Sequence, residues 1–194
     1  KVLKIGRKIR KESNKKMRRI KIHVSVSTFI PKPFTPFQWV KMIDKKEIKK
    51  KQQYLMDNIK GRSLNLSWND PFLSLLEGVF SRGDRRLAAV LKTAWEKGCR
   101  FDGWNDSFNQ NYWEQAFTIN KIDMRDYLRA RDIKAILPWD HINMGINKDF
   151  LENEYKAAID GKITRDCRNN GCTGCGICSE LNVDTVLAGD NDDN

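Results

Sequence analysis

Four of the five cysteines lie close together near the end of the chain. They are Cys167, Cys172, Cys175 and Cys178, spaced C-x4-C-x2-C-x2-C in the stretch CRNNGCTGCGICSE. The three glycines of this stretch let the backbone turn tightly and leave amide N–H groups free to point at sulfur. In a cytosolic protein, thiols crowded in this way indicate metal or redox chemistry rather than a disulfide framework.

The spacing favours one kind of metal centre over another. A C-x2-C-x2-C core is typical of ferredoxin-like iron-sulfur clusters, whose ligands are all thiolates. Structural zinc usually takes two cysteine pairs that are a dozen or more residues apart, whereas here all four thiols share one short loop. We therefore expect an iron-sulfur cluster, with tetrahedral zinc or redox-active thiols as the alternatives. We expect the fifth cysteine, Cys99, to be a small buried side chain.

Other polar residues have both a functional and a structural interpretation. His141 could be an acid-base group oriented by Asp140, but the simpler interpretation is that Asp140 caps a helix start. His23 lies on the polar side of a strand and is expected to be structural. The stretch SRGDRR could form an anion-binding turn or only solvated ion pairs, with arginines at positions 82, 85 and 86. The six tryptophans are expected mostly in the core.

The elements that must position these residues are mixed strand and helix. Apolar residues alternate with polar ones over 20–26, which predicts a strand, and the three prolines of STFIPKPFTPFQW predict an ordered loop after it. Asp44 with Glu47 predicts a capped helix that ends near Gly61, and Asp70 before a proline predicts another helix start. An extended piece, SLNLSW, lies between these two helices. The remaining apolar patterns predict helices over 84–98, 111–117, 124–130 and 148–159.

The basic charge is confined to the first third of the chain. The sequence has 194 residues with 36 Lys and Arg, 25 Asp and Glu and a net charge of +11, and residues 1–60 hold 19 of the basic and 4 of the acidic residues. This basic segment is either a solvated helix or a contact for nucleic acid. No apolar run is long enough to span a membrane and no secretion signal is recognisable, so we expect a soluble, cytoplasmic protein.

Several motifs together resemble one protein family. VSVSTFIPKPFTPFQW resembles the sixth-strand segment of a radical S-adenosylmethionine (SAM) barrel, in the group that reads STFxPKPxTPFQW. The stretches LSWNDPFLSLLEGVFSRGDRRLAAVLKTAWEKGCRFDGW, LPWDHINMGINKDFL and CRNNGCTGCGIC are similar to the later segments of proteins in that group. The resemblance covers residues 20–178. The group is an uncharacterised set of radical SAM proteins, commonly with a cobalamin-binding-like domain upstream.

The resemblance implies that this chain is the C-terminal part of such an enzyme. The CxxxCxxC loop that holds the SAM-cleaving [4Fe-4S] cluster is absent from the sequence, so the four cysteines would bind an auxiliary cluster, which is expected to be [4Fe-4S]. SAM, and cobalamin where it is used, would bind in the complete enzyme, and this part alone is expected to be inactive. The implied partners are the missing N-terminal part of the same enzyme and a DUF2344-type protein.

The implied fold is α/β or α+β, with the last strand or strands of a partial (β/α) barrel followed by a mostly helical extension that bears the cysteines. We expect the end of the barrel over 1–61, the helical extension over 62–160, the cysteine loop over 161–180 and a disordered acidic tail over 181–194. Loops at the carboxyl ends of barrel strands build active sites, so Lys32 in the proline loop is a candidate cofactor or substrate contact. The group's pattern leads us to expect His at position 34, where this chain has Phe34. The alternative function is a nucleic-acid-binding module with a structural zinc knuckle and a basic N-terminal arm.

Overall fold

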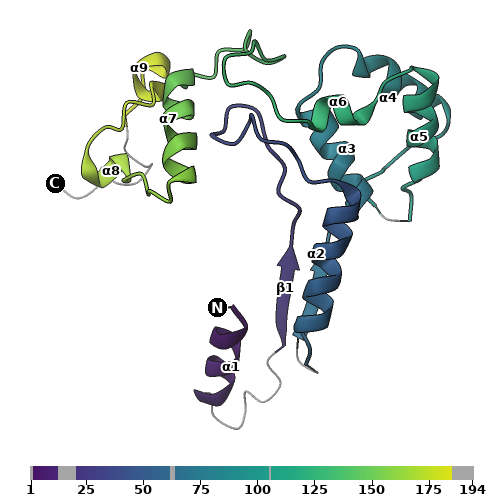
Figure 1. Cartoon of the computed structure of the whole chain (residues 1–194), viewed down its shortest axis with the longest axis horizontal. Helices are drawn as coiled ribbons and strands as arrows, with labels where there is room; N and C mark the ends of the chain where they lie inside the picture. The colour runs from purple at the N-terminus through teal and green to yellow at the C-terminus, as the bar shows by residue number, and fades with distance from the viewer. Residues whose placement is uncertain (1, 13–20, 62–63, 105, 185–194) are drawn as a thin grey trace. The chain divides into compact units, whose positions relative to one another are not determined.

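The computed structural model describes residues 2–12, 21–61, 64–104 and 106–184 (Figure 1). These residues form helices and a small parallel sheet, so the fold is mixed α and β. The chain divides into two compact units that are not consecutive in sequence. Unit 1 consists of residues 1–30 and 43–77, and unit 2 of residues 31–42 and 78–194.

Unit 1 is built around two parallel strands joined by a helix. β1 (Ile22–Val26) pairs with β2 (Leu64–Trp68) in a register that places Val24 opposite Leu66. Parallel strands need a crossover, and α2 (Lys45–Asn58) supplies it. Half-buried and exposed residues alternate along both strands, as the period-2 pattern of β1 predicted. β2 is the SLNLSW segment, which we had assigned to the helical extension, yet its hydrogen-bonding partner is β1.

The helix starts of unit 1 follow the predicted caps. The Asp44 side chain accepts a hydrogen bond of 2.8 Å from the Glu47 amide at the start of α2, and Asp70 accepts from the amides of Phe72 and Leu73 at the start of α3 (Pro71–Ser81). The expected end of α2 at Gly61 is wrong, because the helix ends at Asn58 with Ile59 as its C-cap. α1 (Val2–Glu12) is the basic helix at the N-terminal end of the described chain.

The remaining helices belong to unit 2. α5 (Gln110–Ile119) and α6 (Met124–Leu128) lie where short helices were predicted, and α7 (Lys148–Ile159) has the predicted bounds. α4 (Leu87–Glu96) begins three residues later than expected. The reason is that the Asp84 carboxylate accepts from the Arg86 amide and closes a separate turn before the helix.

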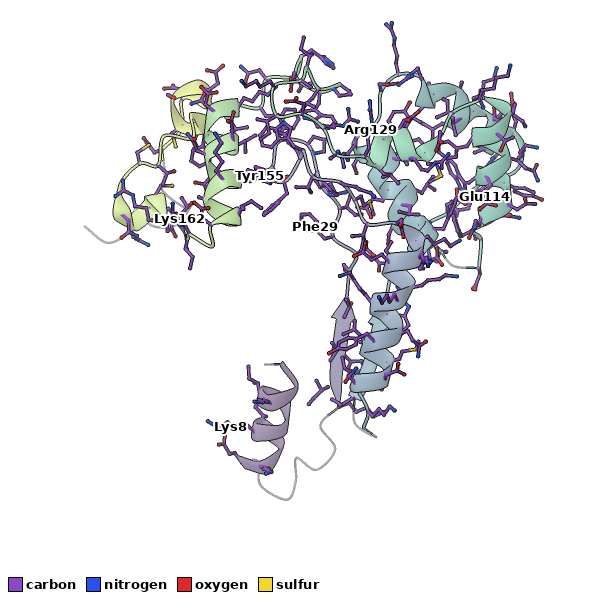
Figure 2. The ribbon with its side chains drawn as sticks, viewed as in Figure 1. Lys8, Phe29, Glu114, Arg129, Tyr155 and Lys162 are labelled. Carbon is purple, nitrogen blue, oxygen red and sulfur yellow. The ribbon has the colours of Figure 1, made fainter. Side chains whose placement is uncertain are left out.

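A buried arginine holds the middle of unit 2 together. Arg82 is fully buried, and its guanidinium donates to the carbonyl oxygens of Val40 and Arg129, at 2.9 and 3.0 Å. Arg131 donates in turn to the Arg82 carbonyl oxygen at 2.9 Å. These bonds connect the proline loop, the end of α3 and the segment after α6, where Figure 2 labels Arg129. Neither alternative for Arg82, an anion-binding turn or a solvated ion pair, holds, because its guanidinium is buried against backbone carbonyl oxygens.

A second cluster joins the proline loop to α7. Trp39, Leu137, Trp139 and Leu151 are buried together, and Tyr155 of α7 places its ring 5.9 Å from that of Phe37 and 6.1 Å from that of Trp39 (Figure 2). Trp113 is buried as well, whereas Trp95 and Trp104 are exposed, so the core prediction for tryptophan holds only in part. The proline loop is therefore packed within unit 2.

Some predictions fall on residues that the structure does not describe. They concern the basic stretch 13–20, which includes the first residue of the predicted strand, and the last ten residues of the acidic tail, 185–194. Within the described ranges, no helix combines the length and the apolar character that crossing a bilayer requires.

Candidate metal centre

The four cysteines lie on two very short helices and the glycine turns between them. Cys167 begins α8 (Cys167–Asn170) and Cys178 lies in the first turn of α9 (Ile177–Leu181), where we had expected only a loop. Gly171, Gly174 and Gly176 have φ angles of 77°, 76° and 95°. These left-handed conformations strain any residue with a Cβ atom, so the glycines are required for the path of the chain between the thiols.

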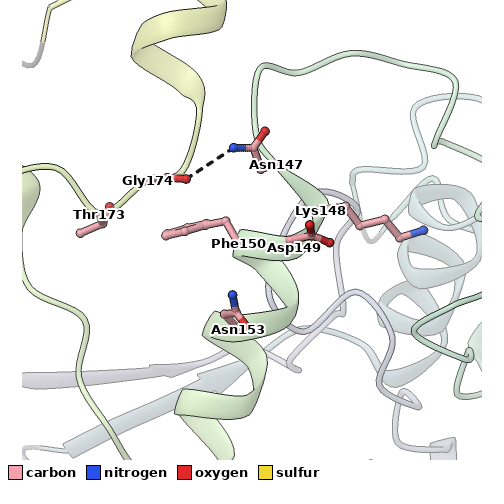
Figure 3. A pocket seen from close by; sticks show the side chains of 7 residues that line it. All are labelled: Asn147, Lys148, Asp149, Phe150, Asn153, Thr173 and Gly174. Atoms are coloured by element: carbon pink, nitrogen blue, oxygen red, sulfur yellow. Dashed lines mark hydrogen bonds between the residues drawn. The ribbon is translucent and has the colours of Figure 1, made fainter.

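The cysteine loop is attached to the start of α7. The Asn147 amide donates to the Cys175 carbonyl oxygen at 2.8 Å, and the Asn147 side chain donates to the Gly174 carbonyl oxygen at 3.4 Å (Figure 3). A hollow of about 360 Å³ lies at this junction, lined by the first turns of α7 and by Thr173 and Gly174. The Asn143 side chain donates to the carboxylate of Glu180, which belongs to α9. The loop thus has a fixed anchor outside its own sequence.

Polar groups in and beside the cysteine loop donate hydrogen bonds to sulfur and to the backbone around it. The Gly174 amide donates to Cys172 Sγ at 3.3 Å, and the Arg165 guanidinium donates to the Cys172 carbonyl oxygen at 3.3 Å. Asp166 caps α8 through the Arg168 amide, and its side-chain bond to the Arg168 guanidinium lowers the pKa of Asp166 to about 2. Cys172 is exposed, and the other three thiols are partly buried.

The donor set fits a thiolate-bound metal, but the sulfur atoms do not converge in this structure. In the described part of the chain, no group of three or more His, Cys, Asp or Glu side chains is placed to hold a metal ion. Metal-ligand loops commonly close only around their metal, because deprotonation and convergence of the thiols are coupled to metal binding. The glycine turns, the amide donor to sulfur and the purely thiol ligand set are the features that suit an iron-sulfur cluster.

Lys32, the candidate cofactor or substrate contact of the proline loop, makes a contact within the protein. Lys32 is half-buried, and its ammonium donates to the Ser81 hydroxyl at 3.0 Å. The next turn is held by Thr35, whose hydroxyl donates to the Lys32 carbonyl oxygen at 2.7 Å. Lys32 therefore serves first to connect the loop to the end of α3.

Asp140 and His141 adopt neither of the two arrangements that the sequence left open. The Asp140 carboxylate accepts from the Leu137 amide and from Lys148, at 2.9 and 2.8 Å. Burial alone would raise the pKa of Asp140, but these two donors outweigh it and hold the pKa below its usual value. Asp140 thus stabilises its own turn, and it neither caps a helix nor orients His141.

The remaining candidates are His23 and Cys99. His23 is exposed on β1, and its Nδ1 lies 3.5 Å from the side-chain nitrogen of Asn65 on β2. Cys99 is buried as predicted, and burial raises the pKa of its thiol.

Sequence reasoning missed two residues that organise these segments, Gln38 and Asn147. Gln38 is buried, and its side-chain oxygen accepts from the Phe34 amide at 3.1 Å and from the Trp139 indole at 2.8 Å. Asn147 joins α7 to the cysteine loop. The sequence carried no signal for the contacts that make these residues important, because Trp139 is 101 residues from Gln38 and Gly174 is 27 residues from Asn147.

Comparison with known proteins gives no relative. No protein-family model, no curated protein and no solved structure matches this chain. The resemblance to radical SAM proteins therefore stays a prediction from the motifs.

Proposed function

We propose that Cys167, Cys172, Cys175 and Cys178 bind an iron-sulfur cluster and that this chain is the C-terminal part of a radical SAM enzyme. The observation that carries the first part is the arrangement of four thiols on glycine turns that are attached to α7 through Asn147. The sequence motifs from the proline loop to the cysteine loop support the second part. The partial barrel belongs to the same proposal, and its support is the parallel β1–α2–β2 unit.

The residues of the chain would act on the cluster in distinct ways. The four thiolates would hold it, and a cluster with four protein ligands supplies electron transfer or structural cross-linking rather than an open iron site. The Gly174 amide, which donates to Cys172 Sγ, would stabilise negative charge on sulfur. Arg165 would add positive charge beside the loop, whereas the charge of Arg168 is paired with that of Asp166. By the resemblance, the complete enzyme would cleave SAM reductively, at a site outside this chain.

The decisive measurement is iron and acid-labile sulfide analysis of the anaerobically purified chain. We expect about four iron atoms per chain and broad visible absorption for a [4Fe-4S] cluster. A variant that carries Cys172→Ala and Cys175→Ala should lose both iron and sulfide. The matched control is Cys99→Ala, which removes a thiol that lies outside the loop and should keep the full iron content.

The outcomes separate the two candidate centres. Zinc without sulfide in the wild-type chain would contradict the cluster and favour the zinc-knuckle alternative, in which the basic helix α1 contacts nucleic acid. In that case binding to an oligonucleotide should weaken steeply with salt. The radical SAM part is tested on the complete protein, which should form 5′-deoxyadenosine from SAM under reducing conditions. Its absence would refute that part and leave the cluster proposal intact.

A further inference from the structure

A cavity in unit 2 brings together three segments that are distant in the sequence. Its volume is about 640 Å³, and it lies among the proline loop, the turn after α3 and the segment that precedes α7. Most of its wall is apolar, formed by the side chains of Pro33, Phe34, Pro138, Trp139 and Ile142. A cavity of this size with mainly apolar and aromatic walls and a few polar groups is typical of a small-molecule site.

Two nitrogen-bearing side chains of the cavity have no acceptor among the described residues. Arg85 and His141 both line it, and among the described residues neither side chain makes a hydrogen bond or an ion pair. Among the described lining residues the one carboxylate is that of Asp84, and it already accepts from the Arg86 guanidinium at 2.8 Å and from the Tyr127 hydroxyl at 3.4 Å. The bond to Arg86 is the main reason that the pKa of Asp84 is lowered. The cavity therefore offers donors to an anion.

Hydrogen bonds maintain a strained backbone at Phe34, which forms part of the aromatic wall. Phe34 has a φ angle of 57°, a left-handed conformation that costs a residue with a side chain about 1–2 kcal/mol. It persists because the Phe34 amide donates to the same Gln38 oxygen that accepts from the indole of Trp139. The two rings are thus coupled through one buried amide, and strain of this kind is typical of binding sites.

We infer that this cavity binds a small molecule in which a phosphate group adjoins a flat ring, as in a nucleoside monophosphate. The ring would lie against Phe34 and Trp139, and the phosphate would accept hydrogen bonds from Arg85 and His141. A guanidinium presents several donors in a plane, which suits phosphate oxygens. The inference goes beyond the proposed function, because none of these residues belongs to the cysteine loop.

The test is calorimetric titration of the full chain with adenosine 5′-monophosphate, adenosine and inorganic phosphate. The nucleotide should bind saturably with a dissociation constant below about 1 mM. Adenosine and inorganic phosphate should each bind more weakly, because each carries only one of the two groups that the cavity recognises. Arg85→Gln and His141→Gln should each weaken nucleotide binding by about tenfold, because each removes a hydrogen bond to a charged group. Both positions are exposed, so the fold should be kept.

A second pair of variants separates the ring from the phosphate. Phe34→Gly keeps the left-handed backbone that glycine prefers, so it should weaken the nucleotide and leave inorganic phosphate unchanged. Lys92→Gln removes an exposed cation outside the cavity and should change nothing. No nucleotide binding at 10 times the expected constant, about 10 mM, would overturn the inference. Equal affinity of the Arg85→Gln and wild-type chains for the nucleotide would also overturn the inference.

The cluster proposal and this inference fail separately. The titration is repeated on the variant that carries Cys172→Ala and Cys175→Ala. Loss of iron with retained nucleotide binding supports both proposals, whereas retained iron content with no nucleotide binding in the wild-type chain refutes only the cavity assignment.

Discussion

Replacing Arg82 by lysine tests whether the buried guanidinium is needed as a fork rather than as a positive charge. Its two terminal nitrogens donate to carbonyl oxygens on different segments, those of Val40 and Arg129. Burial lowers the pKa of Arg82 to about 10, and the neighbouring positive charge of Arg131 contributes to a smaller extent. Arg82 is still protonated at neutral pH, and among the described residues no carboxylate forms an ion pair with it.

The size of the effect follows from these contacts. Lysine keeps the buried charge but cannot reproduce two parallel bonds, and each carbonyl left without a donor costs about 1–3 kcal/mol. We therefore expect Arg82→Lys to lower the free energy of unfolding by about 2 kcal/mol. Arg82→Met leaves both carbonyls without a donor, at about 2–6 kcal/mol, but removes a buried cation that the lowered pKa shows to be disfavoured by about 3 kcal/mol. Together these contributions give a destabilisation of at most about 3 kcal/mol for methionine, which exceeds the loss expected for lysine by no more than about 1 kcal/mol.

The assay is urea unfolding followed by tryptophan fluorescence, with the change in free energy taken from the midpoint at constant slope. All tryptophans except Trp68 lie in unit 2 and report on it. The matched control is Arg85→Lys, which changes an exposed side chain and should stay within about 0.5 kcal/mol of the wild type. An Arg82→Lys chain as stable as this control would refute the reasoning, because the fork would then contribute nothing.

Three further predictions concern turns and charges. Gly83→Ala should destabilise the chain by about 1–3 kcal/mol in the same assay, because a Cβ atom there overlaps a buried leucine side chain and lies 2.9 Å from a backbone carbonyl oxygen. Gly103→Ala meets no atom within 4 Å and should be neutral; equal effects would contradict the packing argument. Asp84→Asn should lower stability by up to about 1 kcal/mol at neutral pH. The pKa of Asp84 is lowered in the folded state, so its contribution is present above the unfolded pKa and is lost as pH falls through the folded one. The stabilities of the wild type and the variant should therefore begin to converge below about pH 4 and meet only at lower pH. A difference that persists at low pH would show another cause. Gly176→Ala should reduce iron content after anaerobic reconstitution more than Gly171→Ala does, because both are left-handed but only at Gly176 would a Cβ atom meet the Asn147 side chain, at 2.7 Å. Equal iron contents would show that the anchor does not matter.

Local signals carried the prediction of most elements. The alternation before the proline loop predicted β1, Asp44 and Asp70 predicted two helix starts, and the pattern over 148–159 predicted α7 with its observed bounds. Caps and periodicity act within a few residues, so they are legible in the sequence alone. The four cysteines with their glycines are legible for the same reason, because every ligand of the candidate site lies in one short segment.

The sequence by itself therefore determined the mixed α and β character of the chain, most helix starts and the identity of the candidate metal ligands. Only the tertiary structure decided that β2 pairs with β1, that Arg82 is buried and that Phe34, Arg85 and His141 line one cavity. The physical reason is distance along the chain. Arg82 contacts carbonyls 42 and 47 residues away, and the Trp139 indole finds Gln38 at a separation of 101 residues. Such contacts are selected by packing between segments, and no short stretch of sequence encodes them.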